Sequence, residues 1–363
     1  MILPDNNRAL IAMSGGVDSS AAALLMQGAG WECVGCTMKL FDGEADCEGA
    51  RSCCSLSDVE DARSVARRLG MPYYVFNFKD AFRAEVVEPF IESYRSGMTP
   101  NPCLACNGRL KFEKLFARAA VLGCGCVVTG HYARIEEEGG CFLLKKARDA
   151  TKDQSYVLYM LRQDQLRHLR FPLGKLAKAE VRALAEAAGF TNAQKPDSQD
   201  ICFVPDGDYA AAIERFTGCP APPGDFVDER GNVLGRHRGI IRYTVGQRRG
   251  LGIAAKEPLY VKAIDAAGNR VILGGAASIY SSGAMLDEVN WVSGETPAGP
   301  VRASVRVRYR GGEQPALVIP EAEGGARILF EKPQRAVTPG QAAVFYDGEI
   351  VLGGGRIRFP IID

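Results

Sequence analysis

The chain has 363 residues, of which 47% are hydrophobic and 24% charged, and its 44 basic and 43 acidic residues give a net charge of +1. This composition excludes a disordered or fibrous protein, and the length predicts two or three domains. No stretch approaches the roughly 18 apolar residues of a membrane span, and the first residues do not form a secretory signal. We therefore expect a folded cytoplasmic protein without a membrane partner.

The first 200 residues alternate between strand and helix patterns. The expected strands are 9–13, 32–38, 73–78 and 126–129, and the expected helices are 20–27, 57–69 (opened by a capping box at Ser57) and 110–122. This alternation predicts an α/β domain over residues 1–205, a doubly wound parallel sheet with helices on both faces. Ligands of such sheets bind at the carboxyl ends of the strands.

The pattern changes after about residue 205, where glycine and proline become frequent and helical periodicity is scarce. Short β-type runs occur at 239–245, 259–264, 270–273, 301–310, 327–330 and 342–346. Runs at this spacing predict small barrels or sandwiches. We expect two β-rich domains, 206–278 and 279–363, joined near residues 276–283.

A glycine-rich segment, Ser14-Gly15-Gly16-Val17-Asp18-Ser19-Ser20, lies between the first expected strand and helix. Glycines allow a tight turn and a close approach of the backbone to a ligand, and the free amides of a helix start bind anions. Asp18 would repel a phosphate alone, but it is explained if it holds a Mg²⁺ ion that bridges phosphates. The alternative is a simple capped connection, which the complete string disfavours.

Twelve cysteines in a chain without a secretory signal predict reduced thiols rather than a disulfide scaffold. Cys33, Cys36, Cys124 and Cys126 lie in apolar strand-like runs, so they are expected to be buried. Cys103, Cys106 and Cys202 lie instead beside polar loops. Cys106 is expected near the start of a helix, where the dipole lowers the pKa of a thiol. A structural or zinc-binding role for the Cys103–Cys106 pair stays open.

Basic residues are concentrated in two places. Seven cations and no acidic residue occur between Arg230 and Lys256. In residues 301–310 the odd positions are apolar, whereas the even positions include four arginines. On a strand this alternation places the arginines on one face, which we interpret as a phosphate-contacting surface rather than a solvated one.

Several motifs, in order, resemble those of the bacterial tRNA-specific 2-thiouridylases, a family of N-type ATP pyrophosphatases. The motifs are Ser-Gly-Gly-Val-Asp-Ser (14–19), Met38-Lys39, Asn-Pro-x-x-x-Cys-Asn (101–107), Thr-Gly-His-Tyr-Ala (129–133), Lys-Asp-Gln-Ser-Tyr (152–156), Asp-Ser-x-x-Ile-Cys-Phe (197–203), Thr-Val-Gly-Gln-Arg-Arg-Gly-Leu (244–251) and Pro-Gly-Gln-x-Ala-Val-Phe-Tyr (339–346). The resemblance extends from about residue 8 to the end of the chain.

The resemblance implies that ATP adenylates the C2 oxygen of the wobble uridine U34, and that sulfur then replaces this oxygen with release of AMP and pyrophosphate. It implies that Cys202 carries a persulfide received from a cysteine desulfurase or a sulfur-relay protein. Cys106 is the implied nucleophile, and the two cysteines can close a Cys106–Cys202 disulfide. The implied substrates are the tRNAs for Lys, Glu and Gln.

Binding residues are implied in the same way. For ATP they are Ala12, Met13, Ser14, Gly15, Gly16, Val17, Asp18, Ser19, Met38 and Gly130; for the target base Asn101, Pro102 and Cys103; for tRNA His131, Lys152, Asp153, Gln154, Arg308, Tyr309 and Gln341. His131 has the alternative of a core histidine. Tyr309 lies on the opposite strand face from Arg308, so the strand has to end or twist there if both contact RNA.

Cys103 departs from the family, because many members have Asp there. With Cys106 and Cys202 it gives three cysteines, which leaves an Fe–S cluster as an alternative sulfur route. Two further alternatives are another ATP pyrophosphatase that acts on tRNA, and a tRNA- or zinc-binding module with an inactive nucleotide loop. Cys47, Cys53 and Cys54 lie in the polar loop 42–57. We interpret this loop either as a flexible insert or as a latent metal site.

Overall fold

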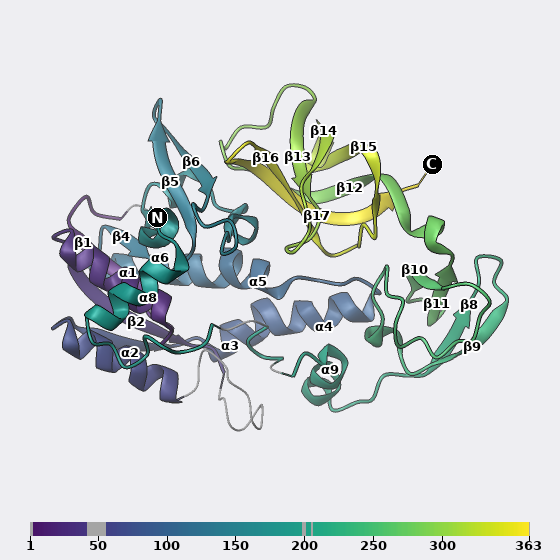
Figure 1. Ribbon diagram of the computed structural model, residues 1–363, viewed down its shortest axis with the longest axis horizontal. Helices are drawn as coiled ribbons and strands as arrows, with labels where there is room; N and C mark the ends of the chain where they lie inside the picture. Colours follow the sequence, from purple (N-terminus) through teal and green to yellow (C-terminus); the bar gives the residue numbers. More distant parts are fainter. Residues whose placement is uncertain (1–2, 42–55, 198–200, 205, 363) are drawn as a thin grey trace.

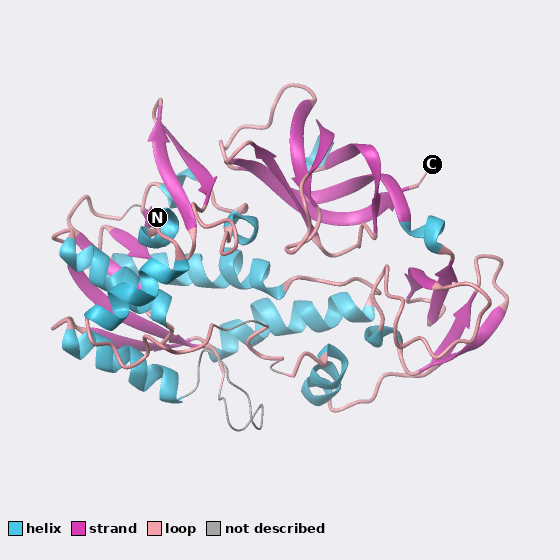
Figure 2. Ribbon diagram, viewed as in Figure 1, coloured by secondary structure: helices cyan, strands magenta, loops and turns pink. Residues whose placement is uncertain are grey.

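The computed structural model describes residues 3–41, 56–197, 201–204 and 206–362 (Figure 1). The segment with Cys47, Cys53 and Cys54 lies outside these residues, so the two interpretations of it stay predictions. Figure 2 shows a helix-rich part, which contains the N-terminus, and two parts built mainly of strands. Within the described ranges, no helix is long and apolar enough to cross a membrane.

A five-stranded parallel sheet forms the centre of the first part, in the order β3-β2-β1-β4-β7. Its strands are β1 (Arg8–Ala12), β2 (Glu32–Lys39), β3 (Tyr73–Asn77), β4 (Cys126–Val128) and β7 (Leu169–Arg170). The residues of β1 alternate between two cores, with Ala9 and Ile11 in one and Leu10 in the other. The expected buried cysteines, Cys33, Cys36, Cys124 and Cys126, are all at most 5% exposed.

Helices cover both faces of this sheet, which confirms the predicted α/β class. One core packs Ala9 and Ile11 against α1 (Val17–Gly28), α2 (Leu56–Arg68) and α8 (Lys178–Ala187). The other packs Leu10 against α4 (Glu88–Arg95) and α6 (Glu113–Val121). Ser57 lies inside α2 rather than before it, so the expected capping role of Ser57 is wrong.

The helix expected from Leu110 starts much earlier. Helical structure runs from α5 (Pro102–Ala105) through a π-helical stretch, η2 (Cys106–Phe112), into α6. Asn101 caps it, because its side chain accepts a hydrogen bond from the Cys103 amide at 3.1 Å. Proline suits the first helical position because its missing N–H would have no partner there. Cys106 therefore lies one turn inside the helix, not at its start.

A six-stranded barrel forms the C-terminal part, because β12 pairs with both β15 and β17. Its strands are β12 (Tyr280–Trp291), β13 (Val301–Arg306), β14 (Gln314–Pro320), β15 (Ala326–Arg335), β16 (Ala342–Asp347) and β17 (Ile350–Ile361). The hairpin β5 (Ala133–Glu138) and β6 (Cys141–Lys146) belongs to the first part of the chain, yet β6 pairs with β17 and extends this sheet. Figure 1 shows the hairpin beside the barrel.

The central part holds a four-stranded sheet in the order β10-β11-β8-β9. Its elements are α9 (Tyr209–Thr217), β8 (Gly224–Val227), β9 (Val233–His237), β10 (Tyr260–Asp265) and β11 (Arg270–Gly274). The strand expected at 239–245 is wrong: η5 (Ile240–Arg242) is a 3-10 turn in which Ile240 and Ile241 are both buried. A strand buried on one face only would alternate instead.

Short helical elements complete the described fold. They are α3 (Lys79–Phe82), η1 (Arg83–Val87), η3 (Ser155–Leu158), α7 (Gln163–Leu166), η4 (Pro172–Lys175), η6 (Ala276–Ile279) and η7 (Ala322–Gly324). Of these, η6 occupies the first half of the expected joint at 276–283, and β12 follows it directly.

Candidate active site

The loop between β1 and α1 is shaped by close backbone contacts. Gly15 has φ +74°, and a Cβ there would lie 2.3 Å from the carbonyl oxygen of Asp58. A Cβ on Gly130, which follows β4, would lie 2.9 Å from the Ser19 amide nitrogen. Side chains larger than hydrogen do not fit at either position. The loop is therefore held in one narrow path at the start of α1.

Hydrogen bonds that are buried or partly buried fix the same loop. The Ser19 hydroxyl accepts from the Ser14 amide at 3.1 Å and donates to the Gly16 carbonyl at 3.0 Å. From a segment far along the chain, the Asn192 amide donates to the Gly15 carbonyl at 2.8 Å. Asn192 is only 3% exposed, and its Oδ1 is one of few buried polar atoms without a partner among the described residues. The loop is thus preorganised, as an anion site needs to be.

Other predicted ATP-binding residues converge on this loop. Ala12 ends β1, Met13 follows it, Met38 lies near the end of β2, and Gly130 follows β4. Because β2, β1 and β4 are parallel neighbours, their carboxyl ends meet at one edge of the sheet. The structure therefore gathers the predicted nucleotide residues, while their role in binding stays a prediction.

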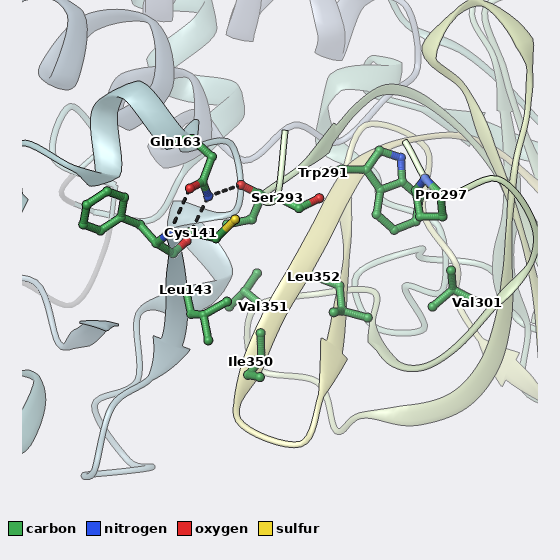
Figure 3. A pocket seen from close by; sticks show the side chains of 12 residues that line it. Cys141, Leu143, Gln163, Trp291, Ser293, Pro297, Val301, Ile350, Val351 and Leu352 are labelled. Carbon is green, nitrogen blue, oxygen red and sulfur yellow. Dashed lines mark hydrogen bonds between the residues drawn. The ribbon is translucent and has the colours of Figure 1, made fainter. Parts of the chain in front are cut away.

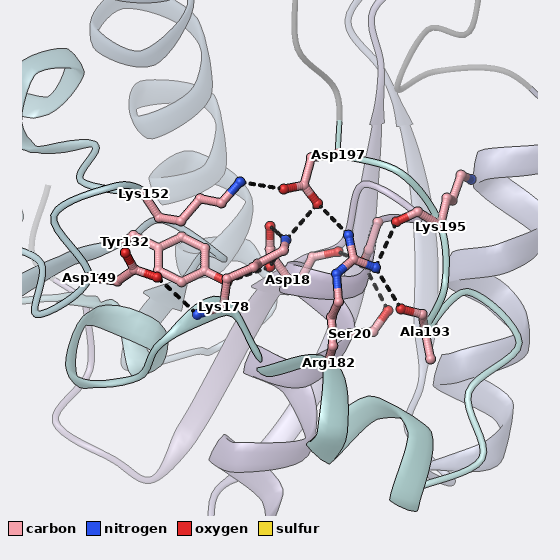
Figure 4. A network of polar contacts seen from close by, with 12 residues as sticks. Asp18, Ser20, Tyr132, Asp149, Lys152, Lys178, Arg182, Ala193, Lys195 and Asp197 are labelled. Atoms are coloured by element: carbon pink, nitrogen blue, oxygen red, sulfur yellow. Dashed lines mark hydrogen bonds and ion pairs between the residues drawn. The ribbon is translucent and has the colours of Figure 1, made fainter. Parts of the chain in front are cut away.

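Asp18, in the first turn of α1, is the centre of an ion-pair network (Figure 4). Lys178 Nζ donates to both of its carboxylate oxygens, at 2.7 and 2.8 Å. The Tyr132 hydroxyl donates to Oδ1 at 2.7 Å, and burial and the Asp18 carboxylate together raise the pKa of Tyr132. Lys178 and Tyr132 thus hold the Asp18 carboxylate in place at the loop.

A second carboxylate, Asp197, gathers three cations beside it. Lys152 and Lys178 each approach it at 2.7 Å, and Arg182 at 2.9 Å. Burial raises the pKa of Asp197, but the hydrogen bonds from the two lysines outweigh this and hold it below its usual range. Figure 4 shows Asp197 between Lys152 and Arg182, next to Asp18. Cations so close to an anion-binding loop suit a polyphosphate ligand.

These residues fit both ATP and Mg²⁺. The loop offers backbone donors at a helix start, and the lysines supply positive charge. In the described part of the chain, no three His, Cys, Asp or Glu side chains are grouped as a metal site. Mg²⁺ needs no such cage, since one or two carboxylates and the substrate phosphates suffice. Asp18 would be that carboxylate, and the ion would neutralise phosphate charge.

The candidate sulfur-transfer cysteines lie in different surroundings. Cys103 is exposed, Cys106 is 8% exposed and Cys202 is intermediate. Cys106 belongs to the same hydrophobic cluster against which Cys202 packs. All three are described, and they are not grouped as a metal site in the described residues. The structure therefore gives the Fe–S alternative no support, and the Cys106–Cys202 disulfide stays a prediction.

His131 lies in an interior environment. It is 9% exposed, its Nδ1 lies 2.7 Å from the Thr129 hydroxyl, and its ring is within 6.0 Å of Phe112 and 5.8 Å of Phe171. Burial, with a contribution from the charge of Lys111, lowers the pKa of His131 to about 3. These are the surroundings of the core-histidine alternative, and contact with tRNA stays a prediction.

The predicted tRNA segment Lys152-Asp153-Gln154 makes contacts within the protein. Lys152 binds Asp197, as described above, and the Gln154 side chain accepts from the Tyr132 amide at 2.9 Å. The Asp153 carboxylate accepts from the Ala147 amide at 3.0 Å, and its side chain is only 6% exposed. Asp153 therefore has a structural role here, beside the predicted contact with RNA.

The arginine face expected on residues 301–310 is not continuous, and its contact with phosphate stays a prediction. β13 ends at Arg306, and this side chain is 17% exposed because it pairs with Glu313 at 2.9 Å and Asp153 at 3.7 Å. The strand does end before Arg308 and Tyr309, as contact of both with RNA requires. Both of these residues are exposed.

Gln341 connects the barrel to the segment before the cysteine helix. Its amide donates to the Thr99 carbonyl at 2.7 Å, and the Thr99 amide donates to the Pro339 carbonyl at 2.9 Å. Thr99 lies two residues before Asn101, the predicted start of the base-binding segment. The barrel therefore positions this segment directly.

A cavity of about 150 Å³ lies where the hairpin meets the barrel (Figure 3). Apolar side chains, including Trp291 and Val351, form most of its wall. Gln163 joins its two sides, because its amide donates to the carbonyls of Phe142 at 2.9 Å and Val292 at 2.6 Å. None of the lining residues is among the predicted site residues. The cavity therefore lies at the contact between the hairpin and the barrel, and not at the nucleotide loop.

The sequence interpretation missed Lys178, Arg182 and Asn192. All three lie more than 150 residues after the loop that they reach, directly or through Asp197. The only local signal was that Lys178 and Arg182 are four residues apart on a helix, which places two cations on one face.

The parallel sheet and its glycine loop define the class: an α/β nucleotide-binding protein of the ATP pyrophosphatase type. Family profiles match residues 7–206 ("tRNA methyl transferase HUP domain"), 216–275 ("tRNA methyl transferase PRC-barrel domain") and 281–357 ("Aminomethyltransferase beta-barrel domain"). The chain is 48% identical, over 97% of its length and 99% of the relative's, to the tRNA-specific 2-thiouridylase MnmA of Acetivibrio thermocellus. It is 49% identical to that of Magnetococcus marinus, over 96% and 98% of the two chains.

The chain therefore belongs to the family of tRNA-specific 2-thiouridylases. Among solved structures, the U34-tRNA thiolase NcsA from Methanococcus maripaludis with its [4Fe-4S] cluster is 18% identical, over 60% of this chain and 72% of that one, with a TM-score of 0.34. A likeness at that level carries no argument about the reaction.

Proposed function

We propose that the protein converts the wobble uridine of tRNA to 2-thiouridine, with ATP as the activating substrate. The observation that carries this proposal is the identity of about 48% over 97% of the chain to proteins named tRNA-specific 2-thiouridylase. The loop at the sheet edge adds physical support, since it offers an anion site with cations beside it. The proposed substrates are the tRNAs for Lys, Glu and Gln.

The first step activates the base. The C2 oxygen of the uridine attacks the α-phosphorus of ATP, pyrophosphate leaves, and C2 now carries AMP as a leaving group. The amides of the loop 14–19, with Lys178 and Lys152, would bind the phosphates. Asn101, Pro102 and Cys103 would hold the flipped uridine, on a segment that Gln341 of the barrel fixes through Thr99.

The second step transfers sulfur. A cysteine desulfurase or relay protein supplies the terminal sulfur of a Cys202 persulfide, and this sulfur attacks C2 as AMP leaves. The Cys106 thiolate then attacks the Cys202 sulfur, so the persulfide S–S bond breaks and a Cys106–Cys202 disulfide forms, which an external thiol reopens.

Domain limits of 1–205, 206–278 and 279–363 are part of the proposal. The family profiles, with limits at 206, 216, 275 and 281, support them.

The test is anaerobic sulfur transfer from cysteine and a cysteine desulfurase to unmodified tRNA with ATP, read by nucleoside mass analysis. Wild type is compared with the Cys106→Ser, Cys202→Ser and Cys103→Ser variants. We expect 2-thiouridine from wild type and Cys103→Ser, and none from the other two. If Cys103→Ser is also inactive and the activity of wild type depends on its iron content, an Fe–S cluster on the three cysteines would replace the persulfide route. A methylated nucleoside formed only with S-adenosylmethionine would refute the proposal.

A further inference from the structure

Cys103 departs from the family pattern, and the proposed reaction gives its thiol no chemical role. It lies in the first turn of the helical structure that starts at Pro102, and its side chain is exposed. Cys106 lies one turn further along, and its side chain is only 8% exposed. One helix thus carries two thiols in succession, the first open to solvent and the second buried.

The backbone holds these two cysteines at a distance that a disulfide can span. The Cys106 amide donates to the carbonyls of both Cys103 and Pro102, which tightens this turn. Residues three apart on an α-helix have α-carbons about 5 Å from each other. Disulfides join α-carbons that are about 4.4–6.8 Å apart. A Cys103–Cys106 bond is therefore compatible with the backbone as it stands.

The position of this pair bears on the Cys106–Cys202 disulfide of the proposed reaction. That disulfide has to be reduced before Cys202 can accept sulfur again. Reduction requires direct access of a thiolate to one of the two sulfurs. Cys106 is nearly closed to solvent and Cys202 is partly buried, whereas Cys103 is exposed. An internal thiol next to Cys106 would therefore open the disulfide faster than a thiol from solution.

We propose that Cys103 is a catalytic residue of enzyme regeneration, and that its thiolate attacks Cys106 Sγ of the Cys106–Cys202 disulfide. The Cys106–Cys202 bond breaks, a Cys103–Cys106 disulfide forms, and Cys202 leaves as a thiolate that can accept the next sulfur atom. The inference rests on the proposed function, since that reaction supplies the first disulfide.

A small thiol from solution completes the cycle at the exposed sulfur. It attacks Cys103 Sγ, and Cys106 leaves as a thiolate. A second molecule of the thiol attacks the mixed disulfide and releases the Cys103 thiolate. One protein disulfide is reduced and two small thiols are oxidised to their disulfide, so the electrons balance.

The first test follows the disulfides of the full-length wild type through one turnover. The enzyme is loaded anaerobically with sulfur by a cysteine desulfurase, freed of excess cysteine, and mixed with tRNA and ATP. Samples are quenched with acid at increasing times, and their free thiols are alkylated. We expect a Cys106–Cys202 disulfide to appear first and a Cys103–Cys106 disulfide to replace it.

Peptide mass analysis separates these two species. Trypsin releases residues 96–109 as one peptide that contains both Cys103 and Cys106. A disulfide between them leaves this peptide single, unalkylated and lighter by two hydrogens. A Cys106–Cys202 disulfide instead links it to a second peptide.

The second test removes the thiol of Cys103 and keeps a polar side chain there, in Cys103→Ser and in Cys103→Asp. For each protein, the rate of tRNA thiolation is measured at excess and at limiting thiol reductant. We expect the ratio of the two rates to rise about tenfold over wild type in both variants, because reduction of a buried disulfide from solution becomes limiting. Cys219→Ser removes another exposed thiol, and this matched control should keep the ratio of wild type.

Three results would overturn the inference. One is a wild type in which the Cys106–Cys202 disulfide persists and no Cys103–Cys106 disulfide forms, a result that needs no variant. Another is a Cys103→Asp protein with the reductant dependence of wild type, since a polar group and not a thiol would then suffice. The third is loss of activity in folded Cys103→Ser at excess reductant, because the proposed exchange acts only after sulfur transfer.

The two proposals fail in different ways. If tRNA gains sulfur while the disulfide stays between Cys106 and Cys202, only the exchange through Cys103 is wrong. If wild type makes no 2-thiouridine, the proposed function is wrong and the exchange is wrong with it.

Discussion

Substitution of Gly16 by alanine separates folding of the glycine loop from its use as a phosphate site. Gly16 is the N-cap of α1 with φ −85° and ψ 160°, a conformation open to alanine. A Cβ there would meet nothing closer than the Ser14 hydroxyl at 3.4 Å, which is an ordinary contact. The cost to folding is then the weaker capping preference of alanine, about 0.5–1 kcal/mol.

The effect on nucleotide binding should be larger. A methyl group at the helix start would occupy the space in which phosphate oxygens approach the amides, so we expect ATP affinity to fall about tenfold or more, or ~1.4 kcal/mol. Calorimetric titration with α,β-methylene-ATP measures the affinity, and urea unfolding measures stability.

Two glycines serve as comparisons. Gly15→Ala should destabilise the protein itself, because φ +74° costs alanine about 1–2 kcal/mol. In addition, its Cβ would press on the Asp58 carbonyl. Gly28→Ala, at the last residue of α1 with open space around it, should leave ATP affinity unchanged. A Gly16→Ala protein that is stable and binds the nucleotide as wild type does would refute the assignment of this loop as the phosphate site.

Three further predictions concern the buried and exposed charges. Asp153→Asn should lower the free energy of unfolding in urea by about 2 kcal/mol, because it weakens a buried pair with Arg306; unchanged stability with weaker tRNA binding would show that RNA contact is its main role. Since the pKa of His131 is lowered to about 3 from 6.5, the unfolded state takes up the proton first. The stability that the neutral ring contributes is thus complete above pH 6.5 and declines as pH falls towards 3, and His131→Gln should flatten this part of the pH profile. Arg308→Ala should reduce the slope of log tRNA affinity against log salt by about one, whereas a slope equal to wild type would remove Arg308 from the phosphate contacts.

Sequence patterns predicted the α/β half well because its signals are local. The apolar runs around Leu10 and Val127 are buried on both faces, and such runs are typical of parallel strands. The same reasoning failed at 239–245, where Ile240 and Ile241 are buried in succession by tertiary contacts and Gly239 turns the chain with φ +110°. A hydrophobic run alone does not distinguish a strand from a buried turn.

The candidate site was predictable only where a motif was continuous. The loop 14–20 was found from its own residues, whereas Lys178 and Asn192 reach it from another helix and a distant turn. Arg306 shows the opposite case, because the alternation of its strand was predicted correctly but its ion pairs were not. Its partners Glu313 and Asp153 lie outside that strand, and the alternation of one strand does not reveal such contacts.

The pairing of β6 with β17 has a consequence for synthesis of the chain. Lys146 bonds through its amide to the Glu349 carbonyl at 2.8 Å, and about 200 residues separate these two. A ribosome needs roughly 10–40 s for that distance. During this time the outer edge of β6 lacks its final neighbour, and such edges are sites of mispairing. Nascent chains stalled before Ile350 should therefore be cut by protease at the hairpin, and chains released after Ile361 should resist.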